Sequence, residues 1–361
     1  MNELDTLLQA SKVAWLTAEG DDSDVVLASR IRLARNLRQL PFPNRADLAQ
    51  LQKADESLQG AMPAVETALG EHMTRVDMES ISGLQREVLR DKQLISDNLL
   101  KNPQHRTVYC NDSQNVSIMV NEDDHIRIQC LTPGLNLETP LQKAFAVDDA
   151  LEGQLDIAFD EKMGYLTACP TNMGTGLRAS VLLHLPGMVY TRNVSSIINI
   201  SPQLGLAVRP LFGDEKEQPG CLFQIANQLT LGYSEQELID NLRGAVTEIV
   251  AHERRARKAL ALYMKERLED EVWRAVGTLS YARLLSEKEL LELASRLRLG
   301  LDLKLIRGIA PECYGEVLIS GRSSFLQNLA ENENLTKTEI DRLRAQHVRK
   351  ILERYRLRLE E

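Results

Sequence analysis

Residues 116–129 read Val-Ser-Ile-Met-Val-Asn-Glu-Asp-Asp-His-Ile-Arg-Ile-Gln. Two apolar runs, one at either end of this stretch, flank three carboxylates that begin at Glu122. In the second run, Ile126 and Ile128 alternate with polar residues, which is the period of a strand with one apolar and one polar face. The stretch therefore predicts a hairpin with an acidic turn.

Similar short β-branched runs occur elsewhere before residue 233, for example at Val25–Leu27 and Val194–Ile200. We interpret them as strands of a sheet, with helical stretches such as residues 79–100 between them. After residue 233 the strand signals nearly vanish. Three capping boxes mark helix starts there, in which a hydroxyl and a carboxylate satisfy free amides: Ser234 with Glu237, Ser286 with Glu289, and Thr336 with Glu339.

Apolar residues follow two of these boxes at helical spacing: Leu238, Leu242, Ile249 and Leu260 after the first, and Ile340, Leu343, His347 and Ile351 after the third. A chain of 361 residues also suits two domains of ordinary size. We therefore predict an α+β fold. An N-terminal extension (1–23) precedes a sheet-containing domain (24–232), and an all-helical domain (233–361) follows.

The composition is that of an acidic globular protein. Asp and Glu number 52 against 43 for Lys and Arg, a formal net charge of −9. This balance argues against nucleic-acid or anionic-membrane binding. The start of the chain lacks the pattern of a signal peptide, and apolar runs stay well short of a membrane span, so we expect a cytoplasmic protein. The five cysteines form no C-x-x-C pair, which argues against a disulfide framework or zinc site; all except Cys169 are predicted core thiols.

Charge is distributed unevenly along the chain. Between Met163 and Gly213 there is no Asp, Glu or Lys, although Arg178, Arg192 and Arg209 are present. Buried strands alone could explain the missing acids. They would not explain the three arginines, whose planar guanidinium suits bidentate contacts with phosphate. The stretch thus predicts an electropositive cleft for an anionic ligand.

Residues 166–180, Leu-Thr-Ala-Cys-Pro-Thr-Asn-Met-Gly-Thr-Gly-Leu-Arg-Ala-Ser, lie within this acid-free region. Gly174-x-Gly176 resembles part of a dinucleotide fingerprint, but the acid expected about 20 residues later is missing, and no Walker lysine follows. An NAD-linked enzyme is therefore a remote alternative. A second arginine group, Arg30 and Arg32, follows a short strand. Two residues apart, both would face the same side, either as a solvated basic face or as part of a site.

Together three motifs resemble the catalytic domain of the phosphagen (guanidino) kinases: Ser29-Arg-Ile-Arg-Leu-Ala-Arg-Asn36, Asn121-Glu-Asp-Asp-His125 with Arg127, and Cys169-Pro-Thr-Asn-Met-Gly-Thr-Gly-Leu-Arg178. The resemblance covers roughly residues 24 to 230 and implies an antiparallel sheet flanked by helices. Kinases of small guanidines carry a helical domain before this one. Here the helical domain comes after it, an order that resembles the bacterial protein-arginine kinases.

The resemblance implies ATP and Mg²⁺ as cofactors, with the metal held through ATP rather than by protein ligands. By position it nominates the following residues for ATP: Ala28, Ser29, Arg30, Ile31, Arg32, Gln93, Arg127, Arg178, Ala179, Ser180, Val181, Leu182, Arg209, Pro210, Leu211, Phe212, Gly213 and Asp214. Ser29 and residues 179–182 would contribute through the main chain. Gln93 stands where the family has a histidine, so it can form a hydrogen bond but cannot carry charge.

The resemblance implies Glu122 and Asp214 as the carboxylates that orient the acceptor guanidinium and accept its proton. The family loop R-G-x-Y-G-E reads Arg209-Pro-Leu-Phe-Gly-Asp214 here, so Asp214 is one methylene shorter than the usual glutamate. Either the loop moves in to compensate, or Glu215 takes over, or activity is weak. Residues 213–220 form a charged loop bounded by glycines, which we predict to be a mobile lid.

Two further positions follow from the resemblance. Cys169 occupies the family's cysteine position beside the guanidine site, where nearby arginines would favour a thiolate. A phosphoarginine-sensing motif, R-D-x-x-R-A, matches Ile340-Asp-Arg-Leu-Arg-Ala345 with isoleucine in place of the leading arginine. Ile340, Asp341, Arg344 and Ala345 are thus either an allosteric pocket or ordinary helix packing.

The leading prediction is an ATP-dependent protein-arginine kinase. By resemblance it would act as a homodimer on arginine-containing proteins and mark them for an unfoldase–protease in stress response, together with an activator protein. Any effect on nucleic acid would be indirect, through a repressor substrate. Two alternatives stay open: a degenerate kinase that only binds nucleotide or phosphoarginine, and a kinase of a free guanidino metabolite.

Overall fold

The protein is described by a computed structural model that covers residues 3–213 and 217–356. Its main sheet contains β1 (Val26–Arg35), β2 (Met73–Asp77), β3 (Thr107–Asn111), β4 (Val116–Val120), β5 (Ile126–Pro133), β8 (Leu177–His184), β9 (Leu206–Pro210) and β10 (Leu222–Asn227). These eight strands follow the order β2-β3-β4-β5-β1-β8-β10-β9, with antiparallel pairing throughout. Strands β6 (Phe159–Asp160) and β7 (Gly164–Tyr165) form a separate small hairpin.

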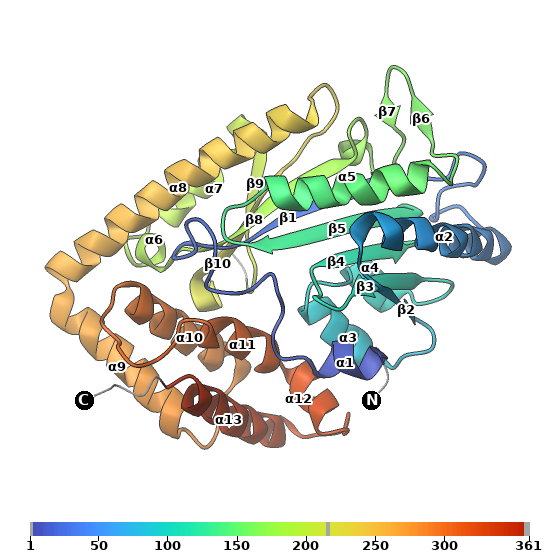
Figure 1. Cartoon of the computed structure of the whole chain (residues 1–361). Helices are drawn as coiled ribbons and strands as arrows, with labels where there is room; N and C mark the ends of the chain where they lie inside the picture. Colours follow the sequence, from blue (N-terminus) through green and yellow to red (C-terminus); the bar gives the residue numbers. More distant parts are fainter. Residues whose placement is uncertain (1–2, 214–216, 357–361) are drawn as a thin grey trace.

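The helices lie around this sheet and, toward the C-terminus, beside it (Figure 1). Up to β10 they are α1 (Glu3–Gln9), α2 (Leu48–Leu69), α3 (Gly83–Asp91), α4 (Asp97–Lys101), α5 (Glu138–Glu152), α6 (Pro186–Tyr190) and α7 (Val194–Ile200), with short 3₁₀ turns η1 (Pro170–Asn172), η2 (Ser201–Leu204) and η3 (Pro219–Cys221). After β10 they are α8 (Glu235–Tyr263), α9 (Lys265–Tyr281), α10 (Glu287–Asp302), α11 (Cys313–Ser320), α12 (Ser323–Leu329) and α13 (Lys337–Arg354).

The hairpin predicted at residues 116–129 is confirmed as the pair β4–β5, in which Val120 lies opposite Ile126. The predicted α+β architecture is confirmed as well. Capping explains where two of the late helices begin, because Ser234 and Thr336 each form a complete capping box with the glutamate three residues later. Ser286 accepts a hydrogen bond from the Glu289 amide at the start of α10.

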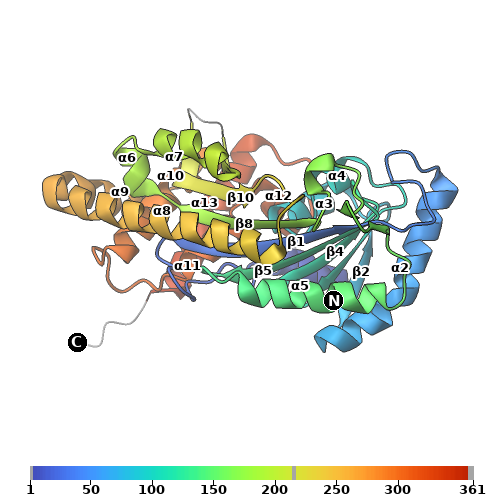
Figure 2. The ribbon, with the colours of Figure 1, turned by 90° about the horizontal axis from the view of Figure 1, so that it is seen from above.

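Most of helix α8 packs with the sheet, and its last turns reach the helices that follow, where Leu260 belongs to their core. Its buried apolar residues Leu238, Leu242 and Ile249 belong to the same core as sheet residues such as Val181 and Ile225. Helices α5 and α8 lie along one face of the sheet, as the view from above shows (Figure 2). The division predicted between residues 232 and 233 stays a prediction; α8 begins just after it, at Glu235, and continues as one helix to Tyr263.

The predicted strand at Val194–Ile200 was wrong, because this segment is helix α7. Val194 is buried, and Ile197 and Ile198 pack against the same core, so the apolar contacts recur every three to four residues. This tertiary packing overrides the strand preference of β-branched residues. The helical stretch predicted at 79–100 is two helices, α3 and α4, separated by a turn in which Gln93 has φ 62°.

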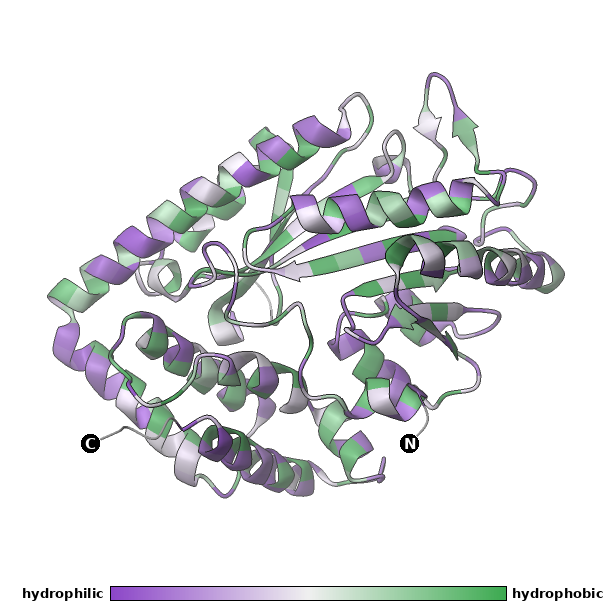
Figure 3. Cartoon of the chain, in the orientation of Figure 1, coloured by the Kyte–Doolittle hydropathy of each residue, from purple (hydrophilic) through white to green (hydrophobic). Residues whose placement is uncertain are grey.

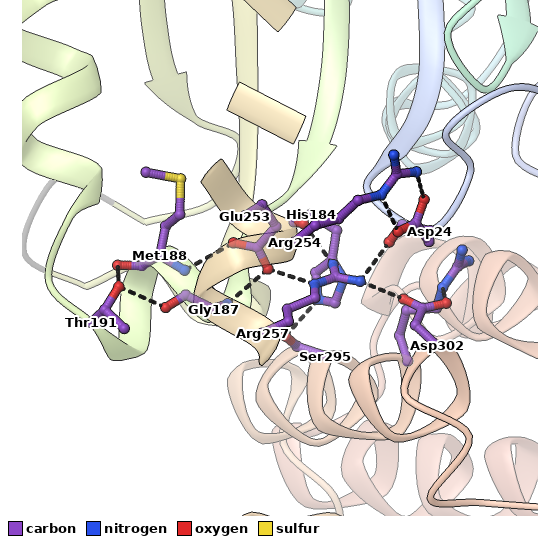
Figure 4. A network of polar contacts seen from close by, with 11 residues as sticks. Asp24, His184, Gly187, Met188, Thr191, Glu253, Arg254, Arg257, Ser295 and Asp302 are labelled. Carbon is purple, nitrogen blue, oxygen red and sulfur yellow. Dashed lines mark hydrogen bonds and ion pairs between the residues drawn. The ribbon is translucent and has the colours of Figure 1, made fainter. Parts of the chain in front are cut away.

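A buried polar network joins the sheet to the helical region (Figure 4). Arg257 of α8 is 3% exposed and forms ion pairs with Glu253 (2.6 Å) and Asp302 (3.2 Å). Its guanidinium also donates to the main-chain oxygens of Asp24 (2.9 Å) and His184 (3.1 Å). These contacts link α8, the start of β1, the end of β8 and the end of α10.

Other side chains complete the network. Glu253 accepts hydrogen bonds from the main-chain amides of Gly187 and Met188, both at 2.8 Å. The His184 ring lies 2.8 Å from the Ser295 hydroxyl, and burial, followed by the nearby arginines Arg257 and Arg298, holds the pKa of His184 well below its usual range. The histidine is therefore neutral in the folded protein at ordinary pH.

Hydrophobic and hydrophilic residues alternate along the helices, as Figure 3 shows for α8. Within residues 3–213 and 217–356, no helix has the length and apolarity needed to cross a bilayer. Three of the four predicted core thiols, Cys110, Cys130 and Cys313, are buried, whereas Cys221 is only partly buried.

Candidate active site

Strand register brings the predicted arginines together on one face of the sheet. β1 lies between β5 and β8, and Arg32 of β1 is directly opposite Arg178 of β8. Arg30, two residues earlier on the same strand and therefore on the same face, is opposite Ser180. Arg127 comes from β5, the other neighbour of β1, so three adjacent strands each contribute guanidinium groups.

The arginines act on one another electrostatically. Burial, followed by the charges of Arg178 and Arg127, lowers the pKa of Arg30 to about 10. Burial and the same neighbours lower the pKa of Arg32 well below its usual range, and burial, Arg209 and Arg127 lower that of Arg178. The buried Arg32 Nε has no hydrogen-bond partner among the described residues. Such a group of like charges favours an anionic ligand.

Gln93 takes part in this cluster. The Arg30 guanidinium donates from Nη1 to Gln93 Oε1 and from Nε to the Ser180 hydroxyl, both at 3.1 Å. The side-chain amide of Gln129 donates to the main-chain carbonyl of Gln93 and so holds the turn against β5. The neutral Gln93 side chain thus orients Arg30 without adding charge.

A cavity of about 320 Å³ lies between the sheet and the helical region, and Arg30 is the member of the arginine cluster that lines it. Several residues nominated for ATP line it: Ala28, Arg30, Gln93, Ser180, Leu182 and the pair Leu211–Phe212. Sequence reasoning missed the opposite wall, where Leu318, Ile319 and Arg322 approach from the C-terminal helices. No motif marked those three residues, because only the tertiary fold brings them to the sheet.

Four other nominated residues have side chains on the opposite face of the sheet. Ile31, Ala179 and Val181 belong to the hydrophobic core, and the Ser29 hydroxyl donates to the Gly134 carbonyl at 2.8 Å. Any contact between these positions and a ligand in the cavity would have to come from the main chain.

The loop that follows β9 carries the remaining nominated residues. Arg209 is exposed on β9, opposite Gln224 of β10, and β9 ends at Pro210. The Leu211 amide donates to the Leu222 carbonyl at 2.8 Å, which fixes the start of the loop. Gly213 has φ 76°, a left-handed conformation that suits glycine. The predicted carboxylate Asp214, and Glu215 with it, lie outside the described residues.

Glu122 is held firmly at the turn between β4 and β5. One carboxylate oxygen accepts a hydrogen bond from the Ser96 hydroxyl at 2.5 Å. The other accepts from the Asp123 amide and pairs with Arg127 Nη1, both at 2.7 Å. The side chain is only 2% exposed. Glu122 therefore lies against the arginine cluster in a fixed orientation.

Asp124 connects this turn to the loop that carries Cys169. Its carboxylate accepts hydrogen bonds from the Asn36 side chain (2.7 Å) and the Ala168 amide (2.6 Å). Asn36 in turn accepts from the His125 amide at 2.9 Å. Burial raises the pKa of Asp124 above its usual value. The sequence placed Asp124 in an acidic turn, but its tie to residue 168 appears only in the fold.

Cys169 immediately precedes the turn η1 and is partly exposed. Its sulfur lies 3.0 Å from the Thr171 hydroxyl, and its charge would raise the pKa of Arg178, against the larger effects of burial and Arg209. A reactive thiolate at Cys169 stays a prediction.

The segment nominated as a phosphoarginine pocket lies on α13, away from this cluster. The buried Arg344 guanidinium donates to Gly321 O and Leu285 O (both 2.8 Å), Asp341 (2.5 Å) and Ser323 Oγ (2.7 Å). Ala345 is buried and Ile340 is partly buried. Nε, Nη1 and Nη2 of Arg344 thus all donate to acceptors within the protein, as expected for ordinary helix packing. The phosphoarginine pocket stays a prediction.

Two family models match the chain. Residues 56–256 match the C-terminal catalytic domain of ATP:guanido phosphotransferases, and residues 265–360 match the C-terminal domain of the protein-arginine kinase McsB. The two matches meet near the end of α8.

Curated relatives extend over nearly the full length. The protein-arginine kinase of Desulforamulus reducens is 44% identical over 340 residues, which are 94% of this chain and 95% of that protein. The protein-arginine kinase of Halalkalibacterium halodurans is 42% identical over 350 residues, 96% of each chain.

Solved structures share the fold. The duplicated taurocyamine kinase of Schistosoma mansoni, with bound components of a transition-state analogue, matches 68% of this chain and 35% of its own, with TM-score 0.57 and 25% identity. A lombricine kinase matches 68% of this chain and 70% of its own, with TM-score 0.52 and 24% identity.

Proposed function

Because this chain belongs to the ATP:guanido phosphotransferase family and, within it, to the protein-arginine kinases, we propose that it transfers the γ-phosphoryl group of ATP to arginine side chains of proteins. The observation that carries this proposal is the placement of Glu122 against a cluster of arginines whose member Arg32 has a buried Nε without a partner among the described residues. One side of the site attracts an anion, and the other presents a carboxylate to a cation.

The arginine cluster fits a nucleotide triphosphate. Arg30, Arg32, Arg127 and Arg178 would contact phosphate oxygens, and Arg209 of the edge strand β9 would join them. Arginine forms bidentate, charge-assisted bonds with phosphate, and an anion relieves the repulsion within the cluster. Mg²⁺ bound to the phosphates would neutralise the charge that builds up on their oxygens during transfer.

Glu122 would bind the acceptor guanidinium. A free guanidinium keeps its proton far above neutral pH and is a poor nucleophile until it is oriented and loses that proton. A carboxylate fixed by Ser96 and Arg127 can orient the group and accept the proton. In the transfer, an N–P bond forms to the acceptor nitrogen while the bond from the γ-phosphorus to the bridging oxygen breaks. The products are phosphoarginine and ADP.

Asp214 would be the second carboxylate, carried on the loop after Phe212, and Cys169 would tune the acceptor side from the loop held by Asp124. On the strength of family membership we extend the proposal to the cell. There the kinase would act as a cytoplasmic homodimer with an activator protein and mark proteins for an unfoldase–protease during stress.

The first experiment incubates the full chain with Mg-ATP and casein and detects phosphoarginine at neutral pH, because acid breaks the N–P bond. We expect product with the wild-type protein and a loss of at least about 100-fold in Glu122→Gln. Asp123→Asn is the matched control at the same turn, since the Asp123 side chain is half exposed and pairs with Arg127 only at 3.5 Å; we expect it to stay within about threefold of wild type.

Other outcomes would redirect the proposal. Loss of product in Asp214→Asn would assign the loop carboxylate to Asp214, and its survival would point to Glu215. Phosphorylation of free arginine in preference to casein would favour a metabolite kinase. ATP binding without any product would contradict the kinase and favour a nucleotide-binding module.

A further inference from the structure

The helical region contributes an arginine to the wall of the 320 Å³ cavity that Arg30 and Gln93 line. Arg322 caps the start of α12 and lines the cavity together with Leu318 and Ile319. Its guanidinium carbon lies 4.7 Å from the centre of the Phe212 ring, within the range of a cation–π contact. Phe212 belongs to the loop after β9, two residues before Asp214 in the sequence.

Carboxylates on two other helices fix the position of Arg322. Its Nη1 pairs with Glu287 of α10 at 2.9 Å, and its Nε lies 3.5 Å from Asp91 at the end of α3. Asp91 also accepts a hydrogen bond from the Ser324 hydroxyl at 2.6 Å. The Arg322 side chain is only 15% exposed. It is therefore part of a built contact and not a mobile surface arginine.

The contact reaches the arginine cluster through α3. Gln93, two residues after Asp91, accepts a hydrogen bond from Arg30 and lines the same cavity. Arg322 thus contacts two elements that border the cavity, namely the loop at Phe212 and the end of α3. Its loss would free both elements at once.

We propose that Arg322 is a positioning residue of the ATP site, supplied by the helical region, and that it acts by holding Phe212 and the end of α3 against the bound nucleotide. The proposal rests on the proposed kinase function. Arg322 lines the cavity together with Arg30 and Gln93, whereas Glu122 does not line it, so we expect its effect on nucleotide binding more than on the chemical step. A residue that only stabilised the fold would lower the active fraction and leave the KM for ATP unchanged.

The test compares steady-state kinetics of Arg322→Gln, Arg322→Lys and Phe212→Leu with those of wild type. For Arg322→Gln we expect the KM for ATP to rise roughly tenfold, with kcat changed by less than about threefold. Arg322→Lys should recover only part of the affinity, because lysine keeps the charge but lacks the planar group that stacks on the ring. Arg267→Gln on α9 is the control; this arginine is 69% exposed and pairs with Glu271.

A double variant separates a shared contact from two independent effects. If Arg322 acts through Phe212, Arg322→Gln combined with Phe212→Leu should bind ATP about as weakly as the weaker single variant. Multiplying effects would overturn the proposal, as would a KM for ATP in Arg322→Gln within twofold of wild type. If Arg322→Gln fails to fold, Phe212→Leu, which leaves both ion pairs in place, must still raise the KM for ATP.

The results that would refute the proposed kinase function differ from those that would refute the role of Arg322. A wild-type protein that neither binds ATP nor transfers phosphate would refute the kinase itself. Normal wild-type kinetics with unaffected Arg322 and Phe212 variants would refute only the role of Arg322.

Discussion

Two groups of arginines, one buried and one partly buried, differ in what surrounds their guanidinium groups. In the network between the sheet and the helical region, Arg257 pairs with Glu253 and Asp302 and donates to two carbonyls. In the cluster on β1 and β8, Arg32 and Arg178 lie opposite each other, and Arg32 Nε has no partner among the described residues. The first arrangement is complete within the protein, whereas the second requires an anion from outside.

The comparison shows why residue type alone does not reveal function. Arg257 and Arg32 are both arginines in regular secondary structure, and each lies near other charged residues. Acceptors within hydrogen-bond reach distinguish a structural guanidinium from one that binds a ligand. Variants in the two groups should therefore fail in opposite ways, one by unfolding and the other by losing activity.

The largest effect on stability is expected for Arg257→Met. Removal of the guanidinium takes one cation from two buried carboxylates; Glu253 keeps its two main-chain donors and Asp302 keeps its pair with Arg298 at 2.8 Å, so we expect a loss at the low end for buried ion pairs, about 3 kcal/mol of unfolding free energy. Denaturant titration measures this loss. Arg254→Met is the control one turn away, because Arg254 is partly exposed and pairs with Asp22 and Asp24 near the surface; it should cost no more than about 1 kcal/mol. Equal losses in the two variants would contradict the distinction.

Arg32→Met should show the reverse pattern. We expect kcat/KM for ATP-dependent transfer to fall about 100- to 1000-fold, because a contact with the developing charge is lost. The unfolding free energy should stay unchanged or rise, since the variant relieves repulsion from Arg30, Arg127 and Arg178. Arg38→Met, at an exposed pair with Asp156, serves as the control and should alter neither quantity. A destabilised but fully active Arg32→Met would place Arg32 with the structural arginines.

A smaller effect links the two regions to pH. His125 lies at the Glu122 turn, where burial lowers its pKa to about 4, and His184 lies in the Arg257 network with its pKa also lowered by burial. Below the ordinary histidine pKa of about 6.5, the unfolded chain binds protons that the folded protein excludes. Stability should therefore fall as pH drops below about 6.5, by about 2 kcal/mol at pH 5 for His125 and in the same direction for His184.

Unfolding titrations of His125→Gln and His184→Gln between pH 7 and 5 measure this dependence. Each variant should lose part of the wild-type slope, and the two reductions should add. An unchanged slope in either variant would contradict the prediction, because it would mean that the replaced histidine has the same pKa in the folded and the unfolded protein.

Much of the sheet could be predicted because its signal is local. The alternation at residues 116–129 fixed the β4–β5 hairpin, and a spacing of two residues placed Arg30 and Arg32 on one face. The segment Val194–Ile200 could not be read in this way. Its β-branched residues favour a strand, and only packing against the core makes it a helix.

The candidate site, like the sheet, could be predicted only where the signal is local in the sequence. Motifs nominated Glu122 and the arginines, which the fold brings together. They could not show that Ser29 and Ile31 face away from the cavity, or that Asp124 ties its turn to residue 168. Nor could they bring Arg322 to Phe212, because no periodicity relates residues on separate elements so far apart in the sequence.

The course of α8 determines how this protein can be divided. A fragment that ended at residue 232 would strip the helix from the sheet and leave an apolar face exposed to water, which favours aggregation. A cut near Tyr263, where Leu262 and Tyr263 are 71% and 81% exposed, would keep that face covered. Even this fragment would leave Arg257 without Asp302. Limited proteolysis should therefore start at the α8–α9 junction and yield an N-terminal piece that is less stable than the intact chain.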